Sequence, residues 1–110
     1  MHLRCRNSPT PRRISNVAME RIPEAELAGY LARTPQWTRE GIEITRTFTF
    51  RNFREAMGFV VQVALLAERA DHHPDIDIRY KQVTLRLSTH SAGGLTEKDF
   101  ALAQQIDQLV

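Results

Sequence analysis

The sequence predicts one α+β domain: a four-stranded antiparallel sheet with three helices packed on one face. Hydrophobic residues recur at helical spacing in three segments and alternate with polar residues in four others, in the order helix, two strands, helix, two strands, helix. The connections are only a few residues long, which favours antiparallel pairing because parallel strands need long crossovers. A length of 110 residues fits one such domain with a modest core.

The first helix is expected from about Pro23 to Thr34. Proline is tolerated in the first turn of a helix, and the acidic residues that follow it suit the positive end of the helix dipole. A second proline ends the helix, because the residue before a proline is disfavoured in the α conformation. The hydrophobic face of this helix comprises Leu27, Tyr30 and Leu31.

Two strands are expected next, a short one beginning at Trp37 and a longer one from Ile42 to Phe50, with a turn at Gly41 between them. In the longer segment isoleucine and phenylalanine alternate with threonine and glutamate, which is typical of a half-buried strand. Arg46 interrupts the apolar side, so we expect that position to lie at a sheet edge.

The second helix is expected from Asn52 to about Ala70, because Asn52 and Glu55 have the spacing of a capping box. Apolar residues surround most of its circumference. A sheet in so small a domain covers one side of a helix, so we expect a second subunit to cover the other; the alternative is a helix enclosed within one monomer. The first apolar stripe comprises Phe53, Met57, Val60, Val61, Ala64 and Ala67, and the second Phe59, Val63 and Leu66.

The second pair of strands is expected at residues 76–80 and 83–87, where apolar and polar residues alternate. The turn between them is expected around Lys81 and Gln82. Because no glycine or asparagine supports that turn, a single bent strand is the alternative.

The last helix is expected to begin after Thr96 and to continue to the end of the chain. Thr96 suits the N-cap position. Asp99 occupies the third helical position, where the helix dipole stabilises a negative charge. Leu95 and Phe100 occupy the two positions of a hydrophobic staple.

The positive charge of the chain is concentrated at its N-terminus. Residues 1–22 hold five arginines and one glutamate, a net charge of +4, whereas residues 23–110 hold ten basic and twelve acidic residues, a net charge of −2. Residues 1–21 show no hydrophobic period, so we expect either a disordered basic leader, similar to a transit peptide, or an over-extended start with Met19 as the initiator. The domain is expected over residues 22–110.

Composition excludes several classes of protein. The longest apolar run, Phe59 to Ala67, is too short to span a bilayer. The single cysteine, Cys5, forms no internal disulfide, which suits the reducing cytoplasm. After residue 22 the basic residues are scattered among acidic ones, so we expect no nucleic-acid partner.

Three histidines are candidates for chemistry. His72 and His73 follow the second helix and His90 follows the last strand, in loops where sites commonly form. Imidazole titrates near neutral pH, so these residues suit acid–base catalysis, with Glu68 and Asp71 near enough in sequence to orient them. Two alternatives stay open: a zinc site of three histidines, or polar side chains without a chemical role.

The spacing of these residues resembles the signature of the pterin-4a-carbinolamine dehydratase family. The similarity extends to the strand around Phe48 and to the loop Ser91-x-Gly93-Gly94, and it covers residues 22–110 but not the leader. The motif reads Glu68-x3-His72-His73-Pro74-x5-Tyr80-x9-His90-x8-Asp99.

The resemblance implies a lyase of the same α+β fold that forms dimers or tetramers. Such enzymes remove water from 4a-hydroxytetrahydropterin, the 4a-carbinolamine, to give quinonoid dihydropterin, which recycles the tetrahydrobiopterin used by aromatic amino acid hydroxylases. It implies a cytoplasmic enzyme with a pterin substrate, without metal or other cofactor and without membrane or nucleic-acid partners. The alternatives are a non-catalytic dimerisation cofactor or assembly chaperone, which would be expected to lose histidines that this chain keeps, and a metal-dependent hydrolase.

By the same resemblance, His72, His73 and His90 are the catalytic residues. We expect His72 and His90 to form the proton-transfer pair, one as acid and one as base, and His73 to help bind the pterin. The expected substrate-binding residues are Glu68, Asp71, Pro74, Thr89, Ser91 and Ala92.

Overall fold

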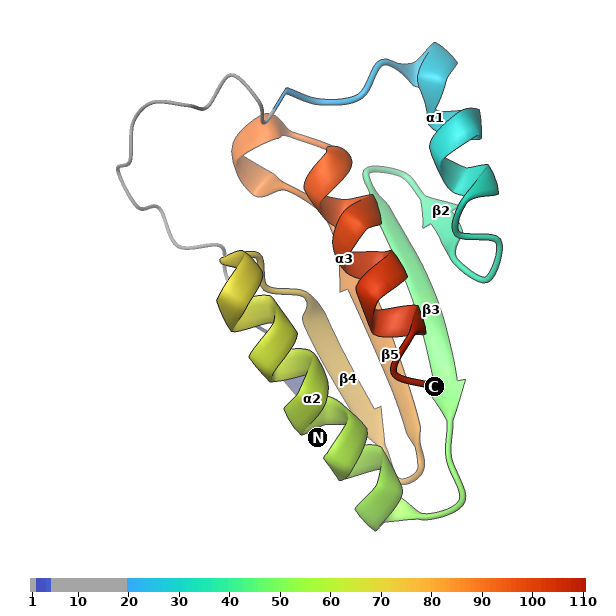
Figure 1. Ribbon diagram of the computed structural model, residues 1–110, viewed down its shortest axis with the longest axis vertical. Coiled ribbons are helices and arrows are strands. Elements are labelled where there is room, and N and C mark those ends of the chain that lie inside the picture. Colours follow the sequence, from blue (N-terminus) through green and yellow to red (C-terminus); the bar gives the residue numbers. More distant parts are fainter. Residues whose placement is uncertain (1, 5–19) are drawn as a thin grey trace.

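The computed structural model describes residues 2–4 and 20–110, in which helices cover one face of an antiparallel sheet (Figure 1). The strand order is β1-β4-β5-β3-β2. All the predicted helices and strands are present in the expected order, which confirms the predicted fold class. The elements are β1 (His2–Arg4), α1 (Glu24–Ala32), β2 (Thr38–Glu40), β3 (Glu43–Thr49), α2 (Phe53–Ala70), β4 (Asp75–Arg79), β5 (Gln82–Leu87), the short 3₁₀ helix η2 (His90–Ala92) and α3 (Glu97–Asp107).

One strand, β1, is not predicted by the sequence. It pairs antiparallel with the outer edge of β4 and adds a fifth strand, with Leu3 opposite Ile76. Three residues are too few to show an alternating pattern, so the sequence carries no signal for this strand. Met1 and residues 5–19 lie outside the described residues, so the disordered leader and the over-extended start both remain predictions.

β4 and β5 form a hairpin, as predicted, rather than a single bent strand. The turn consists of Tyr80 and Lys81, one position earlier than expected. Tyr80 adopts the left-handed backbone conformation (φ 55°) that glycine or asparagine usually supplies, which is why the sequence signal for this turn is weak.

β3 is an inner strand, but β2 pairs only with its first three residues. From Arg46 onward β3 therefore has a neighbour on one side alone. The Arg46 guanidinium lies 4.2 Å from the centre of the Phe48 ring and pairs with Asp107 of α3 (Nη1–Oδ1 2.6 Å). Trp37 Nε1 donates to the same carboxylate, which ties the end of α3 to this edge. Ile42 lies in the turn before β3 and is 55% exposed.

α2 presents one face to the sheet. Its Phe59 ring packs between those of Phe48 and Phe50, with centroid distances of 4.7 and 4.9 Å. The predicted N-cap is present, because the Asn52 side chain accepts a hydrogen bond from the backbone N–H of Glu55. The buried residues of α2 are Ala56, Phe59, Val60, Val63 and Ala67.

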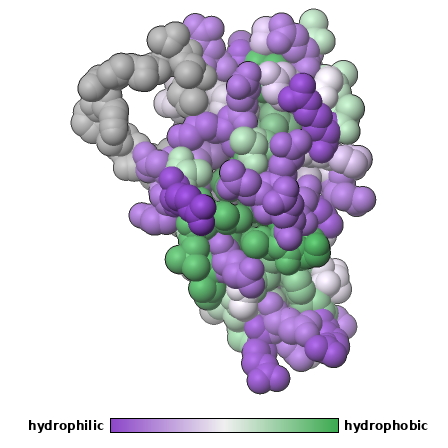
Figure 2. All heavy atoms as spheres, in the orientation of Figure 1, coloured by the Kyte–Doolittle hydropathy of each residue, from purple (hydrophilic) through white to green (hydrophobic). Residues whose placement is uncertain are grey.

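The opposite face of α2 leaves apolar side chains in solvent. Phe53, Val61 and Leu65 are 42%, 55% and 65% exposed. The sequence groups Phe53 and Val61 with Val60, but the buried face centres on Val63, so the first two point away from the core. Figure 2 shows hydrophobic surface over this helix. None of the described helices is long and apolar enough to cross a membrane.

Candidate active site

His72 lies in the interior because of the way α2 ends. Asp71 adopts the left-handed conformation (φ 53°, ψ 45°), and its N–H donates to the carbonyl of Glu68. The N–H of His72 donates to the carbonyl of Ala67 at 3.0 Å, which completes a Schellman-type helix end. The chain therefore reverses toward the sheet, and His72 is only 1% exposed.

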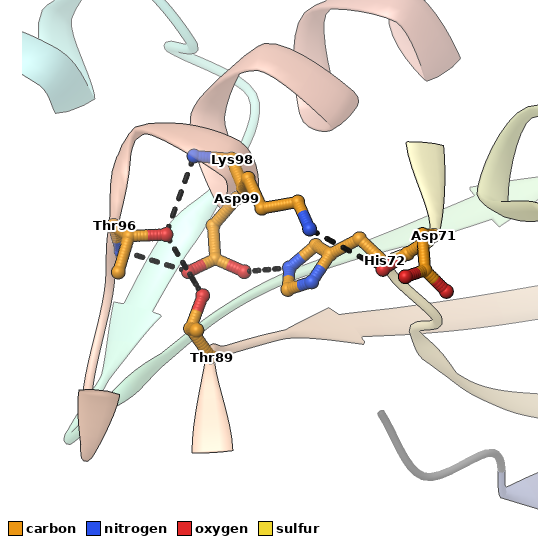
Figure 3. A network of polar contacts seen from close by, with 6 residues as sticks. All are labelled: Asp71, His72, Thr89, Thr96, Lys98 and Asp99. Atoms are coloured by element: carbon orange, nitrogen blue, oxygen red, sulfur yellow. Dashed lines mark hydrogen bonds and ion pairs between the residues drawn. The ribbon is translucent and has the colours of Figure 1, made fainter. Parts of the chain in front are cut away.

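A buried carboxylate holds the His72 ring. Asp99, which is 0% exposed, places Oδ1 2.5 Å from His72 Nε2 (Figure 3). Its Oδ2 accepts two further hydrogen bonds, from the hydroxyl of Thr89 and from the backbone N–H of Thr96, both at 2.9 Å. Asp99 thus joins the end of α2, the end of β5 and the start of α3.

The start of α3 makes a second contact with the loop that carries His72. Thr96 caps α3 as predicted, and it forms a capping box with Asp99; the Thr96 hydroxyl accepts from the backbone N–H of Lys98. The Lys98 ammonium donates to the carbonyl of Asp71 at 3.3 Å. Lys98 therefore holds the backbone of Asp71, and Asp99 holds the ring of His72.

His73 occupies a different environment from its neighbour. Its side chain is 19% exposed, and Nε2 lies 3.1 Å from the Glu68 carboxylate, which is itself 80% exposed. Such a pair is screened by solvent and contributes little to stability. The next residue, Pro74, is buried and leads into β4. A ligand from solvent can therefore reach His73, the exposed Asp71 and, in the last turn of α2, Glu68.

His90 begins η2 and is exposed, as is Ser91, whereas Ala92 is half-buried. The loop closes because Thr89 and Gly94 exchange backbone hydrogen bonds, with the Thr89 N–H donating at 2.9 Å. His90 consequently projects from the surface next to Thr89, whose own side chain is inside the network.

The structure therefore joins some predicted site residues directly and leaves others apart. Thr89 and His72 share Asp99, while His73 pairs with Glu68 on the exposed side of the same loop. The local sequence pattern assigns Thr96 and Asp99 to a helix start, and Asp99 also belongs to the family motif. Neither the pattern nor the motif predicts that they surround His72. The spacing Thr96-x-x-Asp99 predicts a capping box, and nothing in it indicates a distant histidine.

The chemistry available in this arrangement is proton exchange. The imidazoles of His72, His73 and His90 lie on the loops that follow α2 and β5. The carboxylates beside them belong to Glu68 and Asp71 at the end of α2 and to Asp99 in the first turn of α3. Among the residues that the structure describes, no group of three or more His, Cys, Asp or Glu side chains is arranged to hold a metal ion.

Comparisons with known proteins identify the family of the chain. Residues 20–109 match the family model described as pterin 4 alpha carbinolamine dehydratase. A relative from Chloroflexus aurantiacus, provisionally named pterin-4-alpha-carbinolamine dehydratase, is 60% identical over 92 residues, which are 84% of this chain and 99% of the relative.

Two solved structures share the fold. A transcriptional coactivator/pterin dehydratase from Brucella melitensis has a TM-score of 0.79 and 37% sequence identity, covering 82% of this chain and 98% of the other. A pterin dehydratase-like RuBisCO assembly factor of the alpha-carboxysome has a TM-score of 0.55 and 23% identity, covering 66% and 84%; it is similar in fold alone. The family model and the close relatives together place this chain in the pterin-4-alpha-carbinolamine dehydratase family.

Proposed function

We propose that this protein dehydrates 4a-hydroxytetrahydropterin to quinonoid dihydropterin by acid–base catalysis with histidines. The observation that carries the proposal is the imidazole of His72, buried against Asp99, beside the more accessible imidazole of His73 on the same loop. An imidazole oriented by a carboxylate is a common arrangement for proton transfer. Membership of the family supports a pterin as the substrate.

The reaction requires one proton to be delivered and one to be removed. The C4a–O bond breaks as the hydroxyl leaves with an added proton as water. The N5–H bond releases its proton to a base, and its electron pair forms the C4a=N5 double bond. Two imidazoles in opposite protonation states supply both functions without another co-reactant.

The proposed roles follow the accessibility of each residue. His72 and His90 form the proton-transfer pair, and His73 helps to bind the pterin. His90 and His73 reach solvent, which suits contact with a substrate, whereas the fixed ring of His72 suits a defined direction of proton transfer. The residues proposed to contact the pterin are Glu68, Asp71 and Pro74, together with the backbone groups of Thr89, Ser91 and Ala92. The cellular setting proposed is tetrahydrobiopterin recycling for an aromatic amino acid hydroxylase in the cytoplasm.

The test is a dehydratase assay on freshly prepared 4a-hydroxytetrahydropterin, with and without a chelator. We expect His90→Ala to lower turnover by at least about 100-fold, the usual scale for losing a general acid or base. Because His90 is exposed, the melting temperature should stay at the wild-type value. Gln105→Ala, exposed on α3, is the matched control and should keep full activity.

Two results would contradict the proposal. A folded wild-type protein without dehydratase activity would favour a non-catalytic dimerisation or assembly role on the same fold. Activity that the chelator abolishes would favour a metal-dependent reaction.

We also propose that the protein is a homodimer or homotetramer in which the exposed apolar stripe of α2 is covered by another copy. Phe53, Val61 and Leu65 lie on that face, eight and four residues apart. A stripe of this kind is typical of a helix that packs on both sides.

A further inference from the structure

The hydrogen bonds around Asp99 have a single consistent direction. An ionised carboxylate only accepts, so the hydroxyl of Thr89 donates its one proton to Asp99 Oδ2. The Thr89 oxygen lies 2.8 Å from the Thr96 oxygen and has no second proton to give. Thr96 must therefore donate to Thr89, and the Thr96 oxygen is in turn the acceptor for the N–H of Lys98.

The direction of these hydrogen bonds determines which oxygen of Asp99 accepts from His72. Oδ2 already accepts from the Thr89 hydroxyl and the Thr96 N–H. Oδ1 is the oxygen that faces the imidazole, 2.5 Å from Nε2. With Asp99 ionised, Oδ1 can only accept, so Nε2 is the donor and keeps its proton.

Burial and close packing keep the His72 ring in this tautomer. His72 is 1% exposed and Thr89 and Thr96 are 3% and 0% exposed, so water does not compete for the hydrogen bonds. Close packing also resists a rotation of the ring that would exchange its two nitrogens.

We propose that Thr89 and Thr96 are positioning residues that fix His72 as the Nε2–H tautomer through Asp99. Nδ1 is then the nitrogen that takes up or releases a proton. The assignment of Nδ1 to proton transfer with the pterin rests on the proposed function, whereas the tautomer is a property of the free protein.

The first test is ¹⁵N NMR of histidine-labelled protein at a pH where His72 is neutral. In the wild type we expect a protonated Nε2 and an unprotonated Nδ1. In Asp99→Asn, the Thr89 hydroxyl and Thr96 N–H retain the amide oxygen, so the amide NH₂ faces His72 and the proton moves to Nδ1. A wild-type ring with the proton on Nδ1, or an Asp99→Asn ring that keeps it on Nε2, overturns the proposal.

The second test separates the hydroxyl of Thr89 from its packing. Thr89→Val keeps the shape but removes the donor, and we expect kcat to fall about 10-fold, as is usual for residues that orient a reacting group. KM should stay near the wild-type value, and the Nε2–H tautomer should lose population. Thr89→Ser keeps the hydroxyl and should restore both kcat and the tautomer.

Equal losses in Thr89→Val and Thr89→Ser would show that the methyl group matters and would overturn the proposal, as would a Thr89→Val ring that remains wholly Nε2–H. If the wild-type protein has no dehydratase activity, the proposed function fails, while the NMR measurements still decide the tautomer.

Discussion

At the scale of single residues, His72 is both a hydrogen-bond donor in the protein interior and a proposed proton-transfer group. It is as buried as the hydrophobic core, and among the described residues it alone shares a hydrogen bond with Asp99 Oδ1. Removing the ring would delete a titrating nitrogen and also a donor to a buried charge. These two losses can be measured separately.

His72→Gln is expected to separate them. Glutamine carries an N–H donor near the position of Nε2 but has no basic nitrogen, so turnover should fall by at least about 100-fold. His72→Ala leaves the Asp99 acceptor without this donor and should additionally lower the free energy of unfolding by about 1–3 kcal/mol. Turnover measurements and urea unfolding of both variants check this. Wild-type turnover in His72→Gln would exclude His72 from proton transfer.

Asp71 offers a second prediction at this scale. It adopts a left-handed conformation that glycine takes without strain. Asp71→Gly is therefore expected to stabilise the fold by up to about 1 kcal/mol. If the carboxylate contacts the pterin, the same variant should raise KM, and Asp71→Asn should raise KM without the gain in stability. Thermal unfolding and steady-state kinetics would show whether the two effects separate in this way.

At the scale of elements, α2 begins with side-chain hydrogen bonds and ends with backbone hydrogen bonds. At its start, the Glu55 carboxylate accepts from the backbone N–H and the guanidinium of Arg51, rather than from Asn52 as a capping box would require. The hydrogen bonds from the Arg51 side chain, and then from its backbone, lower the pKa of Glu55 below its ordinary value of 4.5.

A pH dependence of stability follows from Glu55. A lowered pKa in the folded state means that the ionised form stabilises the fold fully above pH 4.5, and that this contribution is lost as the pH falls through the lower folded value. Glu55→Gln should therefore unfold at the same temperature as the wild type in strong acid and at a lower temperature near neutrality. Calorimetry at both pH values measures this, and an equal difference at each would contradict it.

At the scale of the whole molecule, the uncovered stripe of α2 predicts self-association. Leu65→Glu places a charge where Leu65 is 65% exposed in the monomer, so the fold should be unchanged. A charge buried in an interface should weaken association by at least about 100-fold, since burying one leucine alone is worth roughly 1.5–3 kcal/mol. Sedimentation at micromolar concentration should show an oligomer for the wild type and a monomer for the variant.

Gln62→Glu introduces the same charge on an exposed polar position of α2 and should leave the oligomer intact. A monomeric wild type would contradict the predicted interface.

The sequence predicts most of the fold because its signals are local. The caps at Asn52 and Thr96 are recognisable from neighbouring residues alone, and both are present. The environment of His72 depends on Asp99, 27 positions away, and no local pattern encodes that pairing. The turn at Tyr80 and the strand β1 were harder for a related reason, since each depends on tertiary contacts rather than on residue preference.

The pairing of β1 with β4 links the choice of translation start to the behaviour of the folded protein. A polypeptide begun at Met19 would lack residues 2–4, and β4 would then become the outermost strand of the sheet. The unpaired backbone groups of an edge strand can pair with another chain, and native proteins commonly protect such edges against aggregation. A chain without residues 2–4 is therefore expected to aggregate more readily than one that keeps them, because the outer backbone groups of β4 would be left unpaired.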